Sequence, residues 1–466
     1  MESTDGETYG QVIENRFKSV ASDPLSTFGV DVDTASYTNI RRMLNYGQVP
    51  PPEAVRVEEM INYFSYDYPA PTGADSFSIT TERGACPWNQ DHELVLVGLR
   101  GKEMEIDKTP PRNLVFLVDV SGSMSRPQKL PLVKASLVRL VKGLTERDTV
   151  AVVTYAGDTG VALEPTSCRN KRPILDCIEG LGAGGSTNGA GGIRAAYDLA
   201  RKSFYRENIN RVILVTDGDF NVGISDPAQL QALIEKERES GVFLTVVGVG
   251  SGNLDDETMS TLAKHGNGQY IYLDSVAEAR RAFEDKLIGT LVTIAKDVKL
   301  QIEFNPAVVE EYRLIGYERR VMRPEDFRDD AKDSGEIGAG HAVTALYEIV
   351  PTRSGAAAQN ASAGVKGKGG ILEVRLRYKA PWAVKAKESS HVLLEDAAST
   401  DNLVFASSIA SFGMVLSGSK FKGSADFDMA MRLGESLEDS GQAELRAEFL
   451  QLIATAKNLA ELRGRE

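Results

Sequence analysis

Between residues 113 and 286 the chain alternates short apolar segments with amphipathic ones. The apolar segments are rich in β-branched residues and cover residues 113–120, 149–157, 211–218, 242–250 and 268–274. Short, continuous apolar runs of this kind are typical of strands that are buried on both faces of a parallel sheet. The intervening segments carry apolar residues at helical spacing. This alternation predicts an α/β fold with a doubly wound, mainly parallel sheet.

The regions on either side follow other patterns. Residues 1–75 are expected to form a mostly helical N-terminal region, and residues 76–111 are expected to form strands. Apolar and polar positions alternate with a period of two over residues 291–398, which predicts a β-sandwich-like domain that the strands of residues 76–111 would join. Residues 399–466 are again helical in pattern. The α/β domain, residues 112–290, is therefore expected to be inserted in or flanked by a β domain.

One segment of the β region has a different composition from its surroundings. Residues 353–370 are made mostly of alanine, glycine, serine and lysine. Such low-complexity composition supplies too few apolar side chains to form a core. A flexible loop is expected there.

The composition indicates a globular protein with more than one domain. The chain has 466 residues, of which 42% are hydrophobic and 26% are charged. A chain of this length normally folds as two or three domains. The formal net charge of −13 argues against a partner that is nucleic acid or an anionic membrane. No run of about 18 apolar residues occurs, so no transmembrane segment is predicted in this chain.

Oxygen-bearing side chains gather where the predicted strands of the α/β domain end. Asp119, Ser121 and Ser123 follow the first apolar run at every second position. Thr187 lies in the segment GGSTN ahead of a predicted helix, and Asp217 follows the run VILVT. The carboxyl ends of parallel strands share one edge of a sheet, so these loops are expected to meet. Two carboxylates and three hydroxyls, without nitrogen or sulfur, suit Mg²⁺ or Mn²⁺.

This set of five residues resembles the metal-ion-dependent adhesion site of von Willebrand factor type A domains. In the motif Asp119-Val-Ser121-Gly-Ser123, with Thr187 and Asp217, all five ligand positions of that family are filled. The resemblance implies a bound Mg²⁺ (or Mn²⁺) that these residues coordinate directly or through water. It also implies that a protein partner supplies an Asp or Glu carboxylate, so the same five residues would bind the partner. The expected function is therefore metal-dependent protein binding and not catalysis.

The flanking regions extend the resemblance to nearly the whole chain. Residues 28–64 and 310–351 are similar to bacterial YfbK-type von Willebrand factor A proteins. Members of that group usually carry an export or lipoprotein signal. The resemblance thus implies an extracytoplasmic location, in the periplasm or at the cell surface, if such a signal has been removed from this chain.

Two alternative functions stay open. The stretch FGVDVDTAS fits the Asp-x-Asp-x-Thr opening of haloacid-dehalogenase-type phosphatases, in which Asp31 would be the nucleophile, Asp33 the acid/base and Thr34 a helper. The preceding STFGV is too short and too polar for the buried parallel strand that this chemistry needs, so Asp33 or Thr34 is expected to be an N-cap. The other alternative is an assembly subunit, a scaffold in which the metal is structural.

An acidic loop is a further candidate cation site. Asp329, Asp330, Asp333 and Glu336 lie close together near glycines. They could hold Ca²⁺, but their spacing is not that of an EF-hand loop. A solvated acidic loop is expected instead.

The cysteines and histidines suggest no catalytic or zinc site. Cys86, Cys168 and Cys177 have no C-x-x-C spacing, and the four histidines are scattered along the sequence. Cys168 and Cys177 could pair across a short loop, or all three could be free and buried. No serine–histidine–aspartate or cysteine–histidine arrangement can be assembled.

Overall fold

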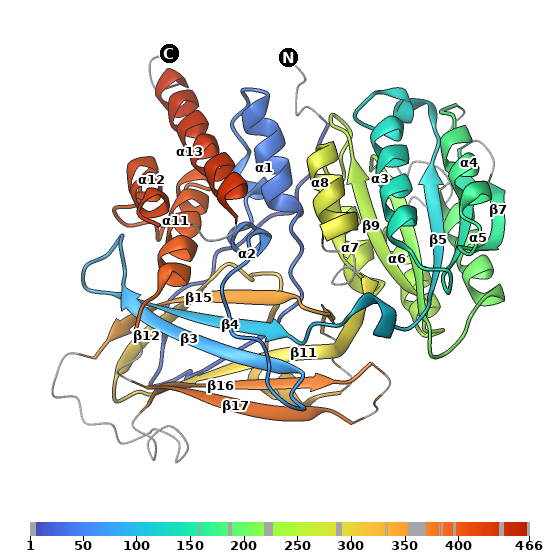
Figure 1. The fold of residues 1–466 in the computed structure, drawn as a ribbon. Coiled ribbons are helices and arrows are strands. Elements are labelled where there is room, and N and C mark those ends of the chain that lie inside the picture. The colour runs from blue at the N-terminus through green and yellow to red at the C-terminus, as the bar shows by residue number, and fades with distance from the viewer. Residues whose placement is uncertain are drawn as a thin grey trace. The chain divides into compact units, whose positions relative to one another are not determined.

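The structure is a computed structural model of the chain, and its ribbon is drawn in Figure 1. It describes residues 6–156, 159–184, 189–218, 227–285, 291–330, 332, 334–352, 370–381, 383, 385–394, 398–437 and 442–463. The chain divides into two compact units by its internal contacts. The first unit comprises Met1–Gly10 and Met104–Thr293, and the second comprises Gln11–Glu103 and Ile294–Glu466.

The first unit is built on one mixed sheet with the strand order β10-β9-β8-β5-β6-β7. The strands are β5 (Arg112–Asp119), β6 (Thr149–Tyr155), β7 (Thr159–Ser167), β8 (Ile209–Thr216), β9 (Phe243–Val249) and β10 (Tyr270–Leu273). All neighbouring pairs are parallel except β6 and β7, which are antiparallel. Every residue of β5 is buried, as expected for a central strand. The mainly parallel α/β sheet predicted from the sequence is confirmed, with β7 as an added antiparallel edge strand.

Helices cover both faces of this sheet. They are α3 (Leu130–Gly143), α4 (Arg172–Gly180), α5 (Gly189–Lys202), α6 (Pro227–Arg238), α7 (Asp256–His265) and α8 (Val276–Arg280), with short turns at Ile106–Lys108, Gly122–Ser125 and Arg281–Asp285. Phe116 of β5 shares a core with Leu137 of α3. The next residue, Leu117, faces the other way toward α5, where a Cβ on Gly192 would come within 3.0 Å of it. Alternation along β5 thus places α3 and α5 on opposite faces.

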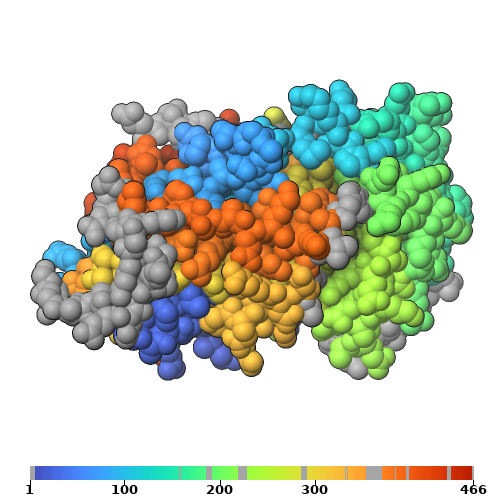
Figure 2. Space-filling model, turned by 90° about the horizontal axis from the view of Figure 1, so that it is seen from below, coloured from blue at the N-terminus to red at the C-terminus, as the bar shows by residue number. Residues whose placement is uncertain are grey.

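The second unit contains two antiparallel sheets. The first has the order β1-β12-β15-β4-β3, with β1 (Lys18–Ser19), β12 (Val309–Ile315), β15 (Ala342–Pro351), β4 (Glu93–Gly101) and β3 (Phe77–Ala85). The second has the order β13-β2-β11-β16-β17, with β13 (Val321–Met322), β2 (Leu25–Gly29), β11 (Thr293–Phe304), β16 (Gly370–Lys379) and β17 (Lys387–Leu394), and β14 (Ile337–Gly338) pairs with β11. Most of β17 is exposed, and it forms part of the orange surface in Figure 2.

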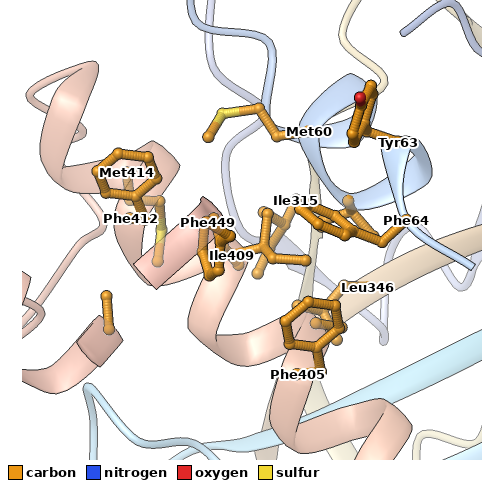
Figure 3. Packing of buried hydrophobic residues seen from close by; sticks show 14 of the residues in the cluster. Met60, Tyr63, Phe64, Ile315, Leu346, Phe405, Ile409, Phe412, Met414 and Phe449 are labelled. Carbon is orange, nitrogen blue, oxygen red and sulfur yellow. The ribbon is translucent and has the colours of Figure 1, made fainter. Parts of the chain in front are cut away.

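Strand β4 is buried on both faces because three layers meet there. Its residues Val95 and Val97 belong to the core between the two sheets, while Leu94 and Leu96 pack on the other side against helices. The helices of this unit are α1 (Ala35–Asn45), α2 (Val57–Tyr63), α11 (Asp401–Leu416), α12 (Phe427–Glu435) and α13 (Ala443–Arg463), with short turns at Pro52–Ala54 and Pro324–Arg328. Figure 3 shows buried side chains of the core under these helices, among them the aromatic rings of Tyr63 at the end of α2, Phe64 directly after it, Phe405 and Phe412 of α11 and Phe449 of α13.

The N-terminal region is less helical than the sequence pattern predicts. Besides α1 and α2 it supplies β1 and β2 to the two sheets. Ser26 and Thr27 of β2 are buried although they are polar, since the strand lies between β11 and β13 and uses its backbone in both ladders. No helix within the described ranges is long and apolar enough to cross a membrane.

Candidate metal site

The site is built on the carboxyl end of β5. Asp119 is the last residue of that strand, and its side chain is fully buried. The backbone N–H of Ser121 donates to Asp119 Oδ1 over 2.8 Å, which fixes the carboxylate against the turn that follows. The hydroxyls of Ser121 and Ser123 lie 3.0 Å apart. The turn therefore holds one carboxylate and two hydroxyls close together, as the sequence spacing predicts.

Asp217 reaches the same edge of the sheet from β8. Strands β5 and β8 pair in parallel, with Val118 beside Val215, so their ends are level. Asp217 is fully buried. The next residue, Gly218, has a φ of +99°, and a Cβ there would lie 2.5 Å from the backbone nitrogen of Asp255. Glycine is thus required for the chain to turn away beside that loop.

A hydrogen bond positions the loop that leads to Thr187. Thr187 itself lies outside the described residues. The N–H of Gly184 donates to the carbonyl oxygen of Val120 over 2.7 Å, and the chain continues as α5 from Gly189. Gly184, three positions before Thr187, therefore lies against the turn that follows Asp119.

The structure adds a residue that the sequence analysis does not identify. Lys129 lies directly before α3, and its Nζ donates to Asp217 Oδ2 over 2.7 Å and to Asn253 Oδ1 over 3.0 Å. Only 3% of Lys129 is exposed. A positive charge at a helix N-terminus is unfavourable for the helix dipole. The position of Lys129 directly before α3 is therefore the sequence signal that could have identified this residue.

The charges around Asp217 determine its ionisation. Burial by itself would raise the pKa of Asp217, but the hydrogen bond and charge of Lys129 outweigh it. Hydrogen bonds from Ser123 and Asn253 add to this effect, and the net result is a pKa below the usual value. Asp217 is therefore an anion at neutral pH, and Ser123 connects it to the turn that contains Asp119 and Ser121.

The donor set is chemically suited to a small divalent cation. Asp119, Ser121, Ser123 and Asp217 are joined by hydrogen bonds at the end of the sheet, and their side chains offer only oxygen donors. Hard oxygen donors, few of them charged, suit Mg²⁺ with water in its remaining positions. Among the residues that the structure describes, no group of three or more histidine, cysteine, aspartate or glutamate residues could hold a metal ion. The predicted set has two carboxylates and three hydroxyls, so a search for three or more such residues does not test it. The assignment of these ligands stays a prediction.

The residues of the phosphatase alternative lie in a different setting. Asp31 follows β2, which is a strand of an antiparallel sheet and not of the parallel one. The guanidinium of Arg320 contacts the carboxylates of Asp31 at 3.1 Å and Asp33 at 3.4 Å. Thr34 is at the N-cap position of α1 but makes no side-chain capping bond. Thr34 therefore takes the expected N-cap position without a side-chain capping bond, and Asp33 pairs with Arg320.

Helix α2, which packs against α1, carries two buried carboxylates, Glu58 and Glu59, and Glu318 lies close to Glu58. Glu59 accepts hydrogen bonds from Arg56, whose charge lowers the pKa of Glu59 although burial opposes this. Burial and the negative charge of Glu59 raise the pKa of Glu58. Burial, with a contribution from the charge of Glu58, raises the pKa of Glu318 to about 8. Glu318 is therefore largely protonated in the folded protein at neutral pH.

Glu318→Gln is expected to stabilise the second unit more at pH 8 than at pH 5. The folded pKa of Glu318 lies above its unfolded value, so its contribution to stability is fully present below about pH 4.5 and is lost as the pH rises toward 8. Because Glu318 is partly exposed, we expect the advantage of the variant to grow by only about 2 kcal/mol over this range. Urea unfolding followed by tryptophan fluorescence measures it, since the buried Trp88 lies in the second unit. Glu435→Gln, at an exposed position of α12, is the control, and an equal effect of Glu318→Gln at both pH values would contradict the prediction.

One carboxylate of the acidic loop, that of Asp330, is paired with basic side chains. Asp330 contacts Arg377 at 2.6 Å and Lys379 at 3.2 Å. Hydrogen bonds from Arg377 and Lys379 lower the pKa of Asp330. Asp333 lies outside the described residues. The expected solvated loop agrees with the 53% exposure of the Asp330 side chain.

The cysteines have no features of nucleophiles. All three are free thiols, so Cys168 and Cys177 do not form a disulfide. Burial raises the pKa of Cys86 to about 12 and that of Cys168 to about 11. These thiols are protonated at neutral pH, whereas a nucleophilic or metal-binding cysteine has to ionise.

Three family models match the chain. The model described as von Willebrand factor type A domain matches residues 113–285, and the one described as uncharacterized protein YfbK, C-terminal, matches residues 289–459. A third model, described as von Willebrand factor, matches residues 3–96. Together they cover most of the sequence, and they confirm both resemblances found in it.

Three of the similar proteins share between 18% and 40% sequence identity with this chain. Uncharacterized protein YfbK of Escherichia coli (strain K12) is 40% identical over an alignment 473 positions long, gaps included, which covers 97% of this chain and 82% of that protein. The human inter-alpha-trypsin inhibitor heavy chain H3 is 28% identical over an alignment 197 positions long, gaps included, which covers 39% of this chain and only 22% of that protein. A solved structure described as von Willebrand factor type A from Catenulispora acidiphila shares 18% identity over 80% of this chain and 88% of its own, with a TM-score of 0.45.

Proposed function

Because the chain belongs to the YfbK family of von Willebrand factor type A domain proteins, we propose that it is a metal-dependent protein-binding module. Its ligand would be an Asp or Glu side chain of a protein partner, and its cofactor would be Mg²⁺ or Mn²⁺. An extracytoplasmic place of action is part of the proposal, as the family resemblance implies.

One observation carries this proposal. The buried carboxylates of Asp119 and Asp217 lie at the point where β5 and β8 end: Asp119 accepts from the Ser121 N–H, the Ser121 hydroxyl lies beside that of Ser123, and Ser123 bonds to Asp217. Strand order reverses there, since β6 lies on one side of β5 and β8 on the other. Ligands of open α/β sheets bind at such reversals.

The protein residues have distinct roles in this proposal. Asp119 and Asp217 supply negative charge, while Ser121 and Ser123 supply neutral oxygens. A bound divalent ion would contribute an electrophilic centre, which retains affinity for an external carboxylate because few formal charges surround it. The Ser121 N–H holds the Asp119 carboxylate in one orientation, so the ligand geometry is fixed before binding.

Titration of Mg²⁺ and Mn²⁺ into chelator-treated protein is expected to show saturable binding at one site. Acetate, a minimal carboxylate, is then expected to raise the apparent Mg²⁺ affinity, because it can fill the position of the partner's side chain. Isothermal titration calorimetry measures both effects. Absence of binding of either ion would refute the proposal. Metal binding that raises the melting temperature without any response to acetate would favour the structural metal of an assembly subunit.

A further inference from the structure

The ammonium group of Lys129 lies inside the proposed metal site. It is 2.7 Å from Asp217 Oδ2, and the same Nζ donates to Asn253 Oδ1. The side chains of Lys129 and Asp217 are 4% and 0% exposed. A fixed cation therefore already neutralises one of the two carboxylates that would bind the metal.

We propose that Lys129 is an internal counter-cation that stabilises the metal-free form of the site and weakens its affinity for a divalent ion. The inference rests on the proposed function and adds a residue that adjusts it. A divalent ion that approaches Asp217 meets either the ammonium charge or the cost of displacing it from two acceptors. Both effects make the free energy of metal binding less favourable.

The path of the side chain leaves little room for Lys129 to move away. It crosses Gly250, which follows β9, and a Cβ at that position would lie 2.3 Å from Lys129 Cε. Gly250 has a φ of +79°, so both its backbone conformation and the lysine chain above it require glycine. The lysine stem thus fills the space that a side chain would take, and its ammonium group is held at Asp217.

The second acceptor is also fixed in place. Asn253 belongs to the loop between β9 and α7, and the N-terminal segment is hydrogen-bonded to this loop. Thr8 N–H donates to Leu254 O over 2.9 Å, Asp256 N–H donates to Thr8 O over 3.1 Å, and Gly252 N–H donates to Glu7 Oε1 over 2.9 Å. Because these three hydrogen bonds hold the loop, Asn253 keeps the ammonium group in a constant position. The counter-charge is therefore part of the folded site.

Lys129→Met is expected to bind Mg²⁺ about tenfold more tightly than wild type, because the apolar side chain keeps the stem and removes the charge. Lys142→Met is the matched control: it removes one charge from an exposed position in the last turn of α3, about 20 Å along the helix, and should leave the affinity unchanged. Calorimetric titration of the three proteins after chelator treatment gives the dissociation constants.

Thermal unfolding provides an independent readout. In chelator Lys129→Met should melt at a lower temperature than wild type, since Asp217 loses its counter-charge, and saturating Mg²⁺ should close most of this gap. If Lys129→Met does not fold, Lys129→Gln retains a donor for Asp217 without the charge and serves in its place. A folded variant with unchanged or weaker Mg²⁺ affinity would overturn the inference while the proposed function stands. If neither wild type nor variant binds metal, both fail.

Discussion

Asp119→Ala is expected to lower the affinity for Mg²⁺ by at least about 100-fold, which amounts to a loss of binding in a calorimetric titration. Replacing a residue that only orients a metal ligand already costs about 10- to 100-fold in affinity, so loss of a carboxylate ligand should cost at least as much. Asp119 is fully buried at the end of β5, and no other carboxylate on that turn can replace it. The readout is the heat of Mg²⁺ binding to chelator-treated protein.

Two further variants make this result specific. Asp119→Asn keeps an acceptor for the Ser121 N–H, so it separates loss of the charge from loss of the turn that Asp119 organises. Asp330→Ala removes a carboxylate of the acidic loop and is expected to bind Mg²⁺ as wild type does, since Arg377 and Lys379 already neutralise Asp330. Equal binding by wild type and Asp119→Ala, with loss in Asp330→Ala, would place the cation in the acidic loop and refute the assignment.

The sequence was sufficient to predict the parts of the site that depend on local pattern. The apolar runs before Asp119 and Asp217 identify two buried parallel strands, and strand ends of a parallel sheet lie on one edge. The every-other-residue spacing of Ser121 and Ser123 similarly reflects a single turn. In each case the relevant geometry involves residues that are neighbours along the chain, so periodicity and spacing describe it.

Contacts between distant segments could not be predicted in this way. Lys129 and Asp217 are 88 positions apart. Their contact depends on the long side chain of Lys129, which passes over Gly250, a residue of a third loop. Asp33 suggested a helix cap from its local context, but its partner Arg320 lies 287 positions away. A carboxylate takes whichever donor the tertiary fold brings to it, and a charged donor competes well with a backbone N–H.

The same limit applies to polar residues in strands. STFGV is too short and too polar for a buried parallel strand, and β2 is indeed not one, yet it is buried between two antiparallel neighbours. Gln301 of β11 donates to Thr27 over 3.0 Å, and Tyr347 of β15 donates to Ser26 over 2.9 Å. These bonds satisfy the hydroxyls and remove the cost of burying them. Such partners come from separate strands, so the local pattern underestimates how deeply a serine or threonine can lie.

The strand that carries Asp119 begins at a buried ion pair. Arg112 is the first residue of β5, and its Nε lies 3.2 Å from Asp148 Oδ1, with both side chains fully buried. Asp148 also accepts hydrogen bonds from the Arg112 N–H and from the N–H and hydroxyl of Thr145. The two terminal nitrogens of the guanidinium have no hydrogen-bond partner among the described residues. Asp148 is therefore the main compensation for a charge that water does not reach.

Asp148→Ala is expected to lower the free energy of unfolding of the first unit by about 3–5 kcal/mol, because it leaves the Arg112 charge buried without a counter-ion. Arg112→Met should cost less, since the carboxylate keeps three other donors, and the double variant should be more stable than Asp148→Ala alone. Urea unfolding followed by circular dichroism measures these differences. Tryptophan fluorescence reports on the second unit, so a loss confined to the first unit would appear in the dichroism alone. A cost below about 1 kcal/mol for Asp148→Ala, or no recovery in the double variant, would contradict this account of the pair.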